Sequence, residues 1–274
     1  GKLYAFEQDT TPPAMPTPAL PANGAKTNSA NPALDWSDVA DASGVTYSLQ
    51  VDDNADFSSP TVSKTGLTSS DYTLASGEAL PDSTYYWRVK ARDGAGLESG
   101  WTASRSFSVD TTPPGVPTAV SPANGSVSTS ATPALDWSDV SDASGVTYRV
   151  QVDNNADFSS PEIDATALSQ SAYTPAVALA QGSQFWRLKT VDGAGNESPW
   201  SDAWSFTVVD TTPPTQPTGL TKISPDNNPL PAFKWTAATD AGTVSSGVAS
   251  YEVQVDSGAW TNIGNKLTFV QPTV

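Results

Sequence analysis

Residues 32–60, PALDWSDVADASGVTYSLQVDDNADFSSP, recur almost unchanged as residues 133–161, PALDWSDVSDASGVTYRVQVDNNADFSSP. The two stretches agree at 25 of 29 positions, which similar composition alone could not produce. The string Asp-Thr-Thr-Pro-Pro marks the same period, because it begins at Asp9, Asp110 and Asp210. The chain is therefore a tandem repeat with a period of about 100 residues, the size of a small β-sandwich.

Apolar and polar residues alternate in the central part of each repeat. Tyr47, Leu49 and Val51 are separated by polar residues, and the same alternation occurs at 148–152 and 251–255. A period of two is typical of a half-buried strand, and no segment shows the sustained period of 3.6 that an amphipathic helix needs. The sequence therefore predicts an all-β fold of tandem Ig-like or fibronectin type III-like β-sandwich modules in an extended array.

The repeats also predict domain boundaries. We expect residues 9–109 and 110–209 to form two β-sandwich repeats and residues 210–274 to form a partial third. Phe6 lies three residues before Asp9, as Phe107 lies three before Asp110, so residues 1–8 are expected to be the last strand of a preceding module. The consecutive prolines of the linkers fix φ and make each linker a short, stiff spacer.

The composition excludes several function classes. The chain has no Cys and no His, which excludes thiol nucleophiles, Cys/His zinc sites and His-based triads. A net charge of −16 repels phosphate backbones and anionic lipids, so nucleic acid is not an expected partner. No apolar run approaches the roughly 20 residues that cross a bilayer, so we expect no membrane insertion within this segment.

Several motifs of the chain resemble a known class of repeat. They are an early Trp (Trp36, Trp137, Trp235), a Tyr-Trp-Arg-Val strand at 86–89 with its Phe-Trp-Arg-Leu copy at 185–188, Asp-Gly-Ala-Gly, and Asp-Thr-Thr-Pro-Pro. They resemble bacterial fibronectin type III-like and immunoglobulin-like repeats of surface proteins and adhesins. One departure is that Tyr85, a candidate tyrosine corner, is replaced by Gln184 in the second repeat.

The resemblance implies a role and a location. The role is that of a non-enzymatic stalk, spacer or surface-filament component, extracellular or at the cell surface, with its export signal outside this segment. The implied partners are neighbouring modules or identical subunits. The alternative is an accessory module, spacing or glycan-binding, of a secreted polysaccharide-degrading enzyme.

The resemblance further implies Ca²⁺ at the module junctions, because related adhesin repeats bind it between an acidic loop and a linker aspartate. The corresponding residues are Asp93, Glu98, Asp110, Asp192, Glu197 and Asp210. Ca²⁺ takes six to eight hard oxygen ligands, which carboxylates and glycine-loop carbonyls supply. The alternative is that Asp-Gly-Ala-Gly is only a turn and that the linker aspartate only caps the turn before Thr-Thr.

Outward-facing aromatic and basic residues are candidates for glycan binding. If Trp87 and Trp186 point inward, Tyr86, Arg88, Phe185 and Arg187 point outward, where sugars could stack. The alternative is that these residues form cation–π or cross-strand packing pairs.

Paired carboxylates occur in the loop after the early Trp, as Asp38 with Asp41 and Asp139 with Asp142. Glycosidases use such pairs, but an active site duplicated in every repeat is not expected of an enzyme. We therefore interpret these loops as solvated acidic turns.

Overall fold

The computed structural model describes residues 8–240 and 246–271, so the strand expected in residues 1–8 lies, except for Gln8, outside the described residues. The chain divides into two compact units. The first comprises Gly1–Val116, Val140–Thr147 and Thr190–Pro199, and the second comprises Pro117–Asp139, Tyr148–Lys189 and Trp200–Val274. The described elements are strands, apart from one 3-10 helix, η1 (Ser76–Glu78). The predicted all-β fold is confirmed.

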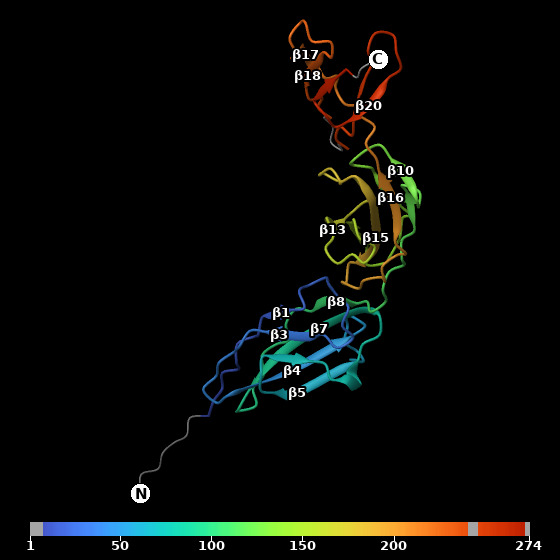
Figure 1. The fold of residues 1–274 in the computed structure, drawn as a ribbon. Coiled ribbons are helices and arrows are strands. Elements are labelled where there is room, and N and C mark those ends of the chain that lie inside the picture. Colours follow the sequence, from blue (N-terminus) through green and yellow to red (C-terminus); the bar gives the residue numbers. More distant parts are fainter. Residues whose placement is uncertain (1–7, 241–245, 272–274) are drawn as a thin grey trace. The chain divides into compact units, whose positions relative to one another are not determined.

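The first repeat folds into two sheets around one apolar core. One sheet has the strand order β1-β3-β6, and the other has the order β2-β8-β7-β4-β5, with β4 beside β7 and β5 (Figure 1). The strands of the first sheet are β1 (Pro18–Leu20), β3 (Ala33–Trp36) and β6 (Asp71–Thr73). Those of the second are β2 (Ala25–Thr27), β4 (Val45–Asp52), β5 (Val62–Leu67), β7 (Ser83–Asp93) and β8 (Arg105–Val109).

Strand β7 shows why the alternating sequence folds in this way. Trp87, Val89 and Ala91 are fully buried, whereas Arg88 and Lys90 between them are half-buried on the opposite face. Successive side chains of a strand point to opposite faces, so the apolar set fills the core and the polar set faces outward. Each large apolar side chain that leaves water contributes roughly 1.5–3 kcal/mol to stability.

The second repeat has the same two-sheet topology. One sheet has the order β14-β11-β9, and the other has the order β10-β16-β15-β12-β13. Their strands are β9 (Ala119–Ser121), β10 (Ser126–Ser128), β11 (Leu135–Trp137), β12 (Val146–Asp153), β13 (Ile163–Leu168), β14 (Ala172–Tyr173), β15 (Gly182–Asp192) and β16 (Trp204–Val208). In both repeats the short early strand pairs in parallel with the last one, β2 with β8 and β10 with β16.

The third repeat has smaller sheets. They have the order β17-β18-β21 and the pair β19-β20, formed by β17 (Thr218–Lys222), β18 (Ala232–Thr236), β19 (Tyr251–Val253), β20 (Thr261–Gly264) and β21 (Thr268–Val270). Trp235 packs edge-on against Tyr251 with ring centroids 5.8 Å apart, as Trp36 does against Tyr47 at 5.5 Å. An open cavity of about 500 Å³ lies beside this pair.

The loop before β7 is closed by a hydrogen bond that spans four residues. The Tyr85 hydroxyl donates to the backbone oxygen of Pro81 at 3.0 Å. In the second repeat the amide of Gln184 donates to the backbone oxygen of Ala180, also at 3.0 Å. The glutamine therefore replaces the tyrosine in this contact. The second repeat closes the loop in the same way although Gln184 stands at the position of Tyr85.

A charged cluster holds η1 against the first repeat. The Tyr72 hydroxyl and the Ala75 N–H donate to Glu78 Oε2 at 2.7 and 3.0 Å, and Lys64 forms an ion pair with Glu78. Lys64, followed by Tyr72 and Ala75, lowers the pKa of Glu78 from 4.5 to about 2. The folded state therefore favours the ionised carboxylate.

Replacing Glu78 with glutamine should flatten the loss of stability in acid. A carboxyl group whose pKa is lowered on folding stabilises the protein above its unfolded pKa, and this contribution is lost as the pH falls through the folded pKa. Between about pH 5 and pH 2.5 the wild type should lose more thermal stability than Glu78→Gln. The melting temperature measured across this range checks the prediction. Glu252→Gln, at an exposed site, is the matched control. Parallel melting curves of the wild type and Glu78→Gln across this pH range would contradict the prediction.

Candidate metal centre

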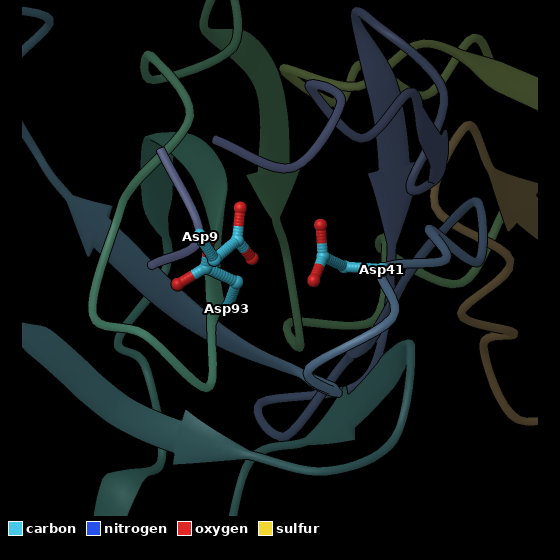
Figure 2. Close-up of side chains that lie close together, drawn as sticks. All are labelled: Asp9, Asp41 and Asp93. Carbon is cyan, nitrogen blue, oxygen red and sulfur yellow. The ribbon is translucent and has the colours of Figure 1, made fainter. Parts of the chain in front are cut away.

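Two groups of three aspartates lie in the first unit. Asp9, Asp41 and Asp93 form the first trio, and one carboxylate oxygen of each lies within 4.8 Å of those of the other two. Figure 2 shows the carboxyl group of Asp41 facing those of Asp9 and Asp93. Asp110, Asp142 and Asp192 form the second trio with the same spacing. Each trio therefore contains one aspartate from a linker, one from the acidic turn after the early Trp, and one from the Asp-Gly-Ala-Gly loop.

The loop between β3 and β4 positions Asp41. The Val39 N–H donates to the Tyr47 hydroxyl at 2.9 Å, which anchors the loop to the core. The Ser43 N–H and hydroxyl both donate to Asp41 Oδ1, at 2.8 and 2.7 Å. These hydrogen bonds, the backbone one first, hold the pKa of Asp41 below its ordinary value of 3.8. The carboxylate is therefore charged at neutral pH.

Asp93 ends β7 and begins the Asp-Gly-Ala-Gly loop. The Leu97 N–H donates to Asp93 Oδ1 at 2.8 Å and so closes the loop. The Gly94 N–H donates to the Ser43 hydroxyl at 2.9 Å, which ties this loop to the one that carries Asp41. A Cβ atom at Gly94 would lie 2.2 Å from the backbone oxygen of Ser43, so only glycine allows the two loops to approach this closely.

The second oxygen of Asp93 is the unusual feature of the first trio. Asp93 is 5% exposed, and its Oδ2 atom is buried without a hydrogen-bond partner in the part of the chain that the structure describes. No ion pair of the described residues includes Asp9, Asp41 or Asp93. A buried carboxylate oxygen without a hydrogen-bond partner is costly, and two neighbouring carboxylates add repulsion. The first trio therefore has the electrostatics of a cation site.

The second trio is held by equivalent hydrogen bonds. The Ser144 N–H and hydroxyl donate to Asp142 Oδ1, both at 2.7 Å. The Ala194 and Asn196 N–H groups donate to Asp192 Oδ1, both at 2.8 Å. Ser144 is the main cause that lowers the pKa of Asp142, and the charge of Lys26 adds to it.

The donor set of the first trio fits calcium. Calcium binds carboxylate, carbonyl and water oxygens at roughly 2.3–2.6 Å, so two ligand atoms on opposite sides of one ion lie roughly 5 Å apart. One carboxylate oxygen from each aspartate of the trio lies within 4.8 Å of those of the other two, which is within that span. Three carboxylates supply part of the six to eight ligands, and backbone carbonyls and water can supply the others.

The residues expected to bind metal fall into two groups. Asp93, Asp110 and Asp192 lie in the trios. The linker aspartates Asp9 and Asp110 each meet the acidic loop of the repeat that follows, so Asp110 lies with Asp192 and not with Asp93. Glu98, Glu197 and Asp210 belong to neither trio. Glu98 forms an ion pair with Lys90, Glu197 lies in a bridge with Val191, and Asp210 accepts hydrogen bonds from Ser246.

Sequence reasoning missed Asp9, Asp41 and Asp142. Asp9 belongs to the same Asp-Thr-Thr-Pro-Pro string as Asp110, so the sequence carried a signal for it. Asp41 and Asp142 were interpreted as solvated turns, and the trios show them grouped with buried aspartates. Their identical Asp-Ala-Ser-Gly setting in both repeats was the available signal.

The residues expected to bind glycan lie on the outward face of the larger sheets. Arg88 is stacked between Phe57 and Trp101, with its guanidinium carbon 4.1 and 4.7 Å from the ring centroids. Its Nε and Nη2 also donate to Gln50 Oε1 at 2.9 and 2.7 Å. The guanidinium faces are therefore used in cation–π stacking within the sheet, the alternative that the sequence left open.

The second repeat builds the same stack. Arg187 lies between Phe158 and Trp200 at 4.2 and 4.5 Å, and donates to Gln151. Phe185 and Tyr86 are half-buried beside these stacks. The glycan-binding hypothesis for Tyr86, Arg88, Phe185 and Arg187 stays a prediction.

Within residues 8–240 and 246–271, no helix has the length and apolar character needed to cross a bilayer.

No protein-family model and no curated protein match the sequence. Many solved structures match the chain, and three of them serve as examples. The fibronectin(III)-like modules of CbhA from Clostridium thermocellum share 13% identity, with a TM-score of 0.46, 72% of this chain covered and 95% of theirs. The FN1-FN3 domains of chicken CNTN1 share 14% identity, with a TM-score of 0.30 and coverage of 96% and 90%. The chicken interferon gamma receptor alpha chain shares 15% identity, with a TM-score of 0.31 and coverage of 71% and 98%.

Proposed function

We propose that this chain is a non-enzymatic spacer of β-sandwich repeats, in which calcium bound at the acidic trios ties each linker aspartate to the loops of the repeat that follows. The spacer role is supported by the repetition of the same sandwich and by the use of its basic and aromatic surface residues in internal stacks. The calcium role is supported by the buried, unpartnered oxygen of Asp93.

Calcium would act on the protein through the charges of the trio. In the first trio it would neutralise two of three neighbouring carboxylates and give Asp93 Oδ2 the partner it lacks among the described residues. Asp9, Asp41 and Asp93 come from the linker and from two different loops, so one ion would hold three separate segments together. An ion that binds the folded state and not the unfolded state raises stability, by about 2.7 kcal/mol at 100 times its dissociation constant.

The proposal includes an extracellular or cell-surface location. Calcium sites of extracellular modules have dissociation constants on the order of 10⁻⁴–10⁻³ M, which suits a site of three carboxylates completed by carbonyls and water. The absence of cysteine also means that the chain needs no oxidative step to fold after export.

Replacing Asp93 with asparagine should change the response to calcium in two opposite ways. Without calcium, the variant should be at least as stable as the wild type, because it removes a buried charge, one oxygen of which has no partner among the described residues, and the repulsion from Asp9 and Asp41. With calcium, it should lose most of the gain in melting temperature, because the site loses a charged ligand. The measurement is the melting temperature of the full chain in chelator and in millimolar Ca²⁺.

Asp38→Asn is the matched control, because Asp38 is exposed and lies three residues before Asp41 in the same loop. It should keep the calcium response of the wild type. If the wild-type melting temperature does not change between chelator and millimolar Ca²⁺, the calcium part of the proposal is wrong. If Asp93→Asn and Asp38→Asn respond like the wild type, calcium binds elsewhere.

A further inference from the structure

The two trios differ at one position beside the buried aspartate. Leu97 follows Asp93 by four residues, and Asn196 stands at the same place after Asp192. Both donate their backbone N–H to Oδ1 of the aspartate at 2.8 Å, so this contact is the same in the two loops. Only the asparagine carries a side chain that can make hydrogen bonds.

The side chain of Asn196 joins two members of the second trio. Its Nδ2 donates to Asp192 Oδ2 at 2.7 Å and to the backbone oxygen of Asp110 at 2.7 Å. A carboxylate and a carbonyl only accept hydrogen bonds, so the amide nitrogen, not the amide oxygen, must face them. Asp192 Oδ2 and the backbone oxygen of Asp110 are oxygens of the type that calcium binds, and both already accept hydrogen bonds from the Asn196 amide.

A positively charged group also lies beside the second trio. Lys26 Nζ donates to the backbone oxygen of Ser144 at 2.6 Å. A Cβ atom at Gly193 would lie 3.3 Å from the same Nζ, which places the ammonium group at the Gly193 and Ser144 loops that carry Asp192 and Asp142. Its charge offsets part of the negative charge that would attract a cation.

We infer that the side chain of Asn196 competes with a cation for the oxygens of the second trio, so that the first trio binds Ca²⁺ more tightly than the second. This inference rests on the proposed function, because it takes calcium as the ligand of the first trio. In the first trio Leu97 offers no side-chain donor, and Asp93 Oδ2 is left without a partner among the described residues. In the second, the amide gives the corresponding oxygen of Asp192 a partner.

The test is a reciprocal exchange of the two residues in the full chain, with Ca²⁺ binding measured by calorimetry. The wild type should show two sites of unequal affinity, or one site if the second is too weak to detect. Asn196→Leu should tighten the weaker site by roughly tenfold, because it removes a hydrogen-bonded competitor for a charged ligand. Leu97→Asn should weaken the tighter site by a similar factor. Asp41→Asn and Asp142→Asn, which each disable one trio, assign the sites.

Each result has a definite meaning. Two equal sites in the wild type, or a weaker second site in Asn196→Leu, would overturn the inference and leave calcium binding in place. The second of these results would mean that Asn196 is itself a calcium ligand. Absence of Ca²⁺ binding to the wild type would overturn the proposed function and the inference together. If Asn196→Leu does not fold, as judged by hydrogen exchange of β12 and β15, Leu97→Asn alone decides, and an unchanged affinity of the first trio overturns the inference.

Discussion

Replacing Trp87 with alanine should destabilise the first repeat by about 3–5 kcal/mol, the cost of a large-to-small change at a fully packed aromatic site. Trp87 is 0% exposed and lies in the middle of β7, where its strand neighbours are Val51 of β4 and Arg105 of β8. Its side chain therefore extends from the centre of the five-stranded sheet into the core between the two sheets. Removal leaves a cavity that the surrounding strands can fill only in part.

The indole N–H of Trp87 reduces the expected loss slightly. It is buried without a hydrogen-bond partner, so truncation also removes a polar group that was costly to bury. Trp87→Phe keeps most of the ring and removes this N–H. We therefore expect it to cost clearly less than Trp87→Ala, and the difference between the two variants reports the packing of the ring.

Hydrogen exchange of the full chain, read by mass spectrometry, locates the effect. Peptides from β4, β7 and β8 should exchange faster in Trp87→Ala, whereas peptides from β12, β15 and β16 should not change. Trp260→Ala is the matched control, because Trp260 is 63% exposed and should cost less than about 1 kcal/mol. A loss below about 1 kcal/mol at Trp87 would mean that this side chain does not hold the core together.

The strands that form the core could be predicted because their sequences alternate. Tyr47, Leu49 and Val51 are all buried, as are Tyr148, Val150 and Val152, and each set carries the period-two signal. The parallel pairing of β2 with β8 could not be predicted in this way. Strand β2 has only three residues and none of them is buried, so no apolar pattern fixes its register.

The candidate metal centre could be predicted only in part, because contacts between distant segments build it. The sequence pointed to Asp93, Asp110 and Asp192 through their repeated loops and linkers. It could not show that the Gly94 N–H reaches Ser43, 51 residues away, and so brings Asp41 to Asp93. The same limit applies to the arginine stacks, where the partners of Arg88 lie 31 residues before it and 13 residues after it.

Replacing Gly94 with alanine should separate the two loops that carry Asp41 and Asp93. The added Cβ would lie 2.2 Å from the Ser43 backbone oxygen, 3.1 Å from its carbonyl carbon and 3.2 Å from its Cβ. The nearest atoms belong to the backbone, so no side-chain rotation can relieve the clash. Overpacking of this kind typically costs about 1–3 kcal/mol, and the loop shift must move Ser43, which holds Asp41 Oδ1.

The expected result is a lower melting temperature in chelator together with a reduced calcium response. This combination differs from that of Asp93→Asn, which should lose the response without losing stability in chelator. Gly77→Ala is the matched control, because a Cβ at Gly77 would meet no atom within 4 Å and its φ is not in the left-handed region. That variant should change stability by less than about 0.5 kcal/mol or raise it slightly, because alanine restricts the unfolded chain. Gly94→Ala could instead keep its melting temperature in chelator and its full calcium response. The clash would then have been relieved without moving Asp41 away from Asp93. That result would mean that calcium binding does not require the close contact between the two loops.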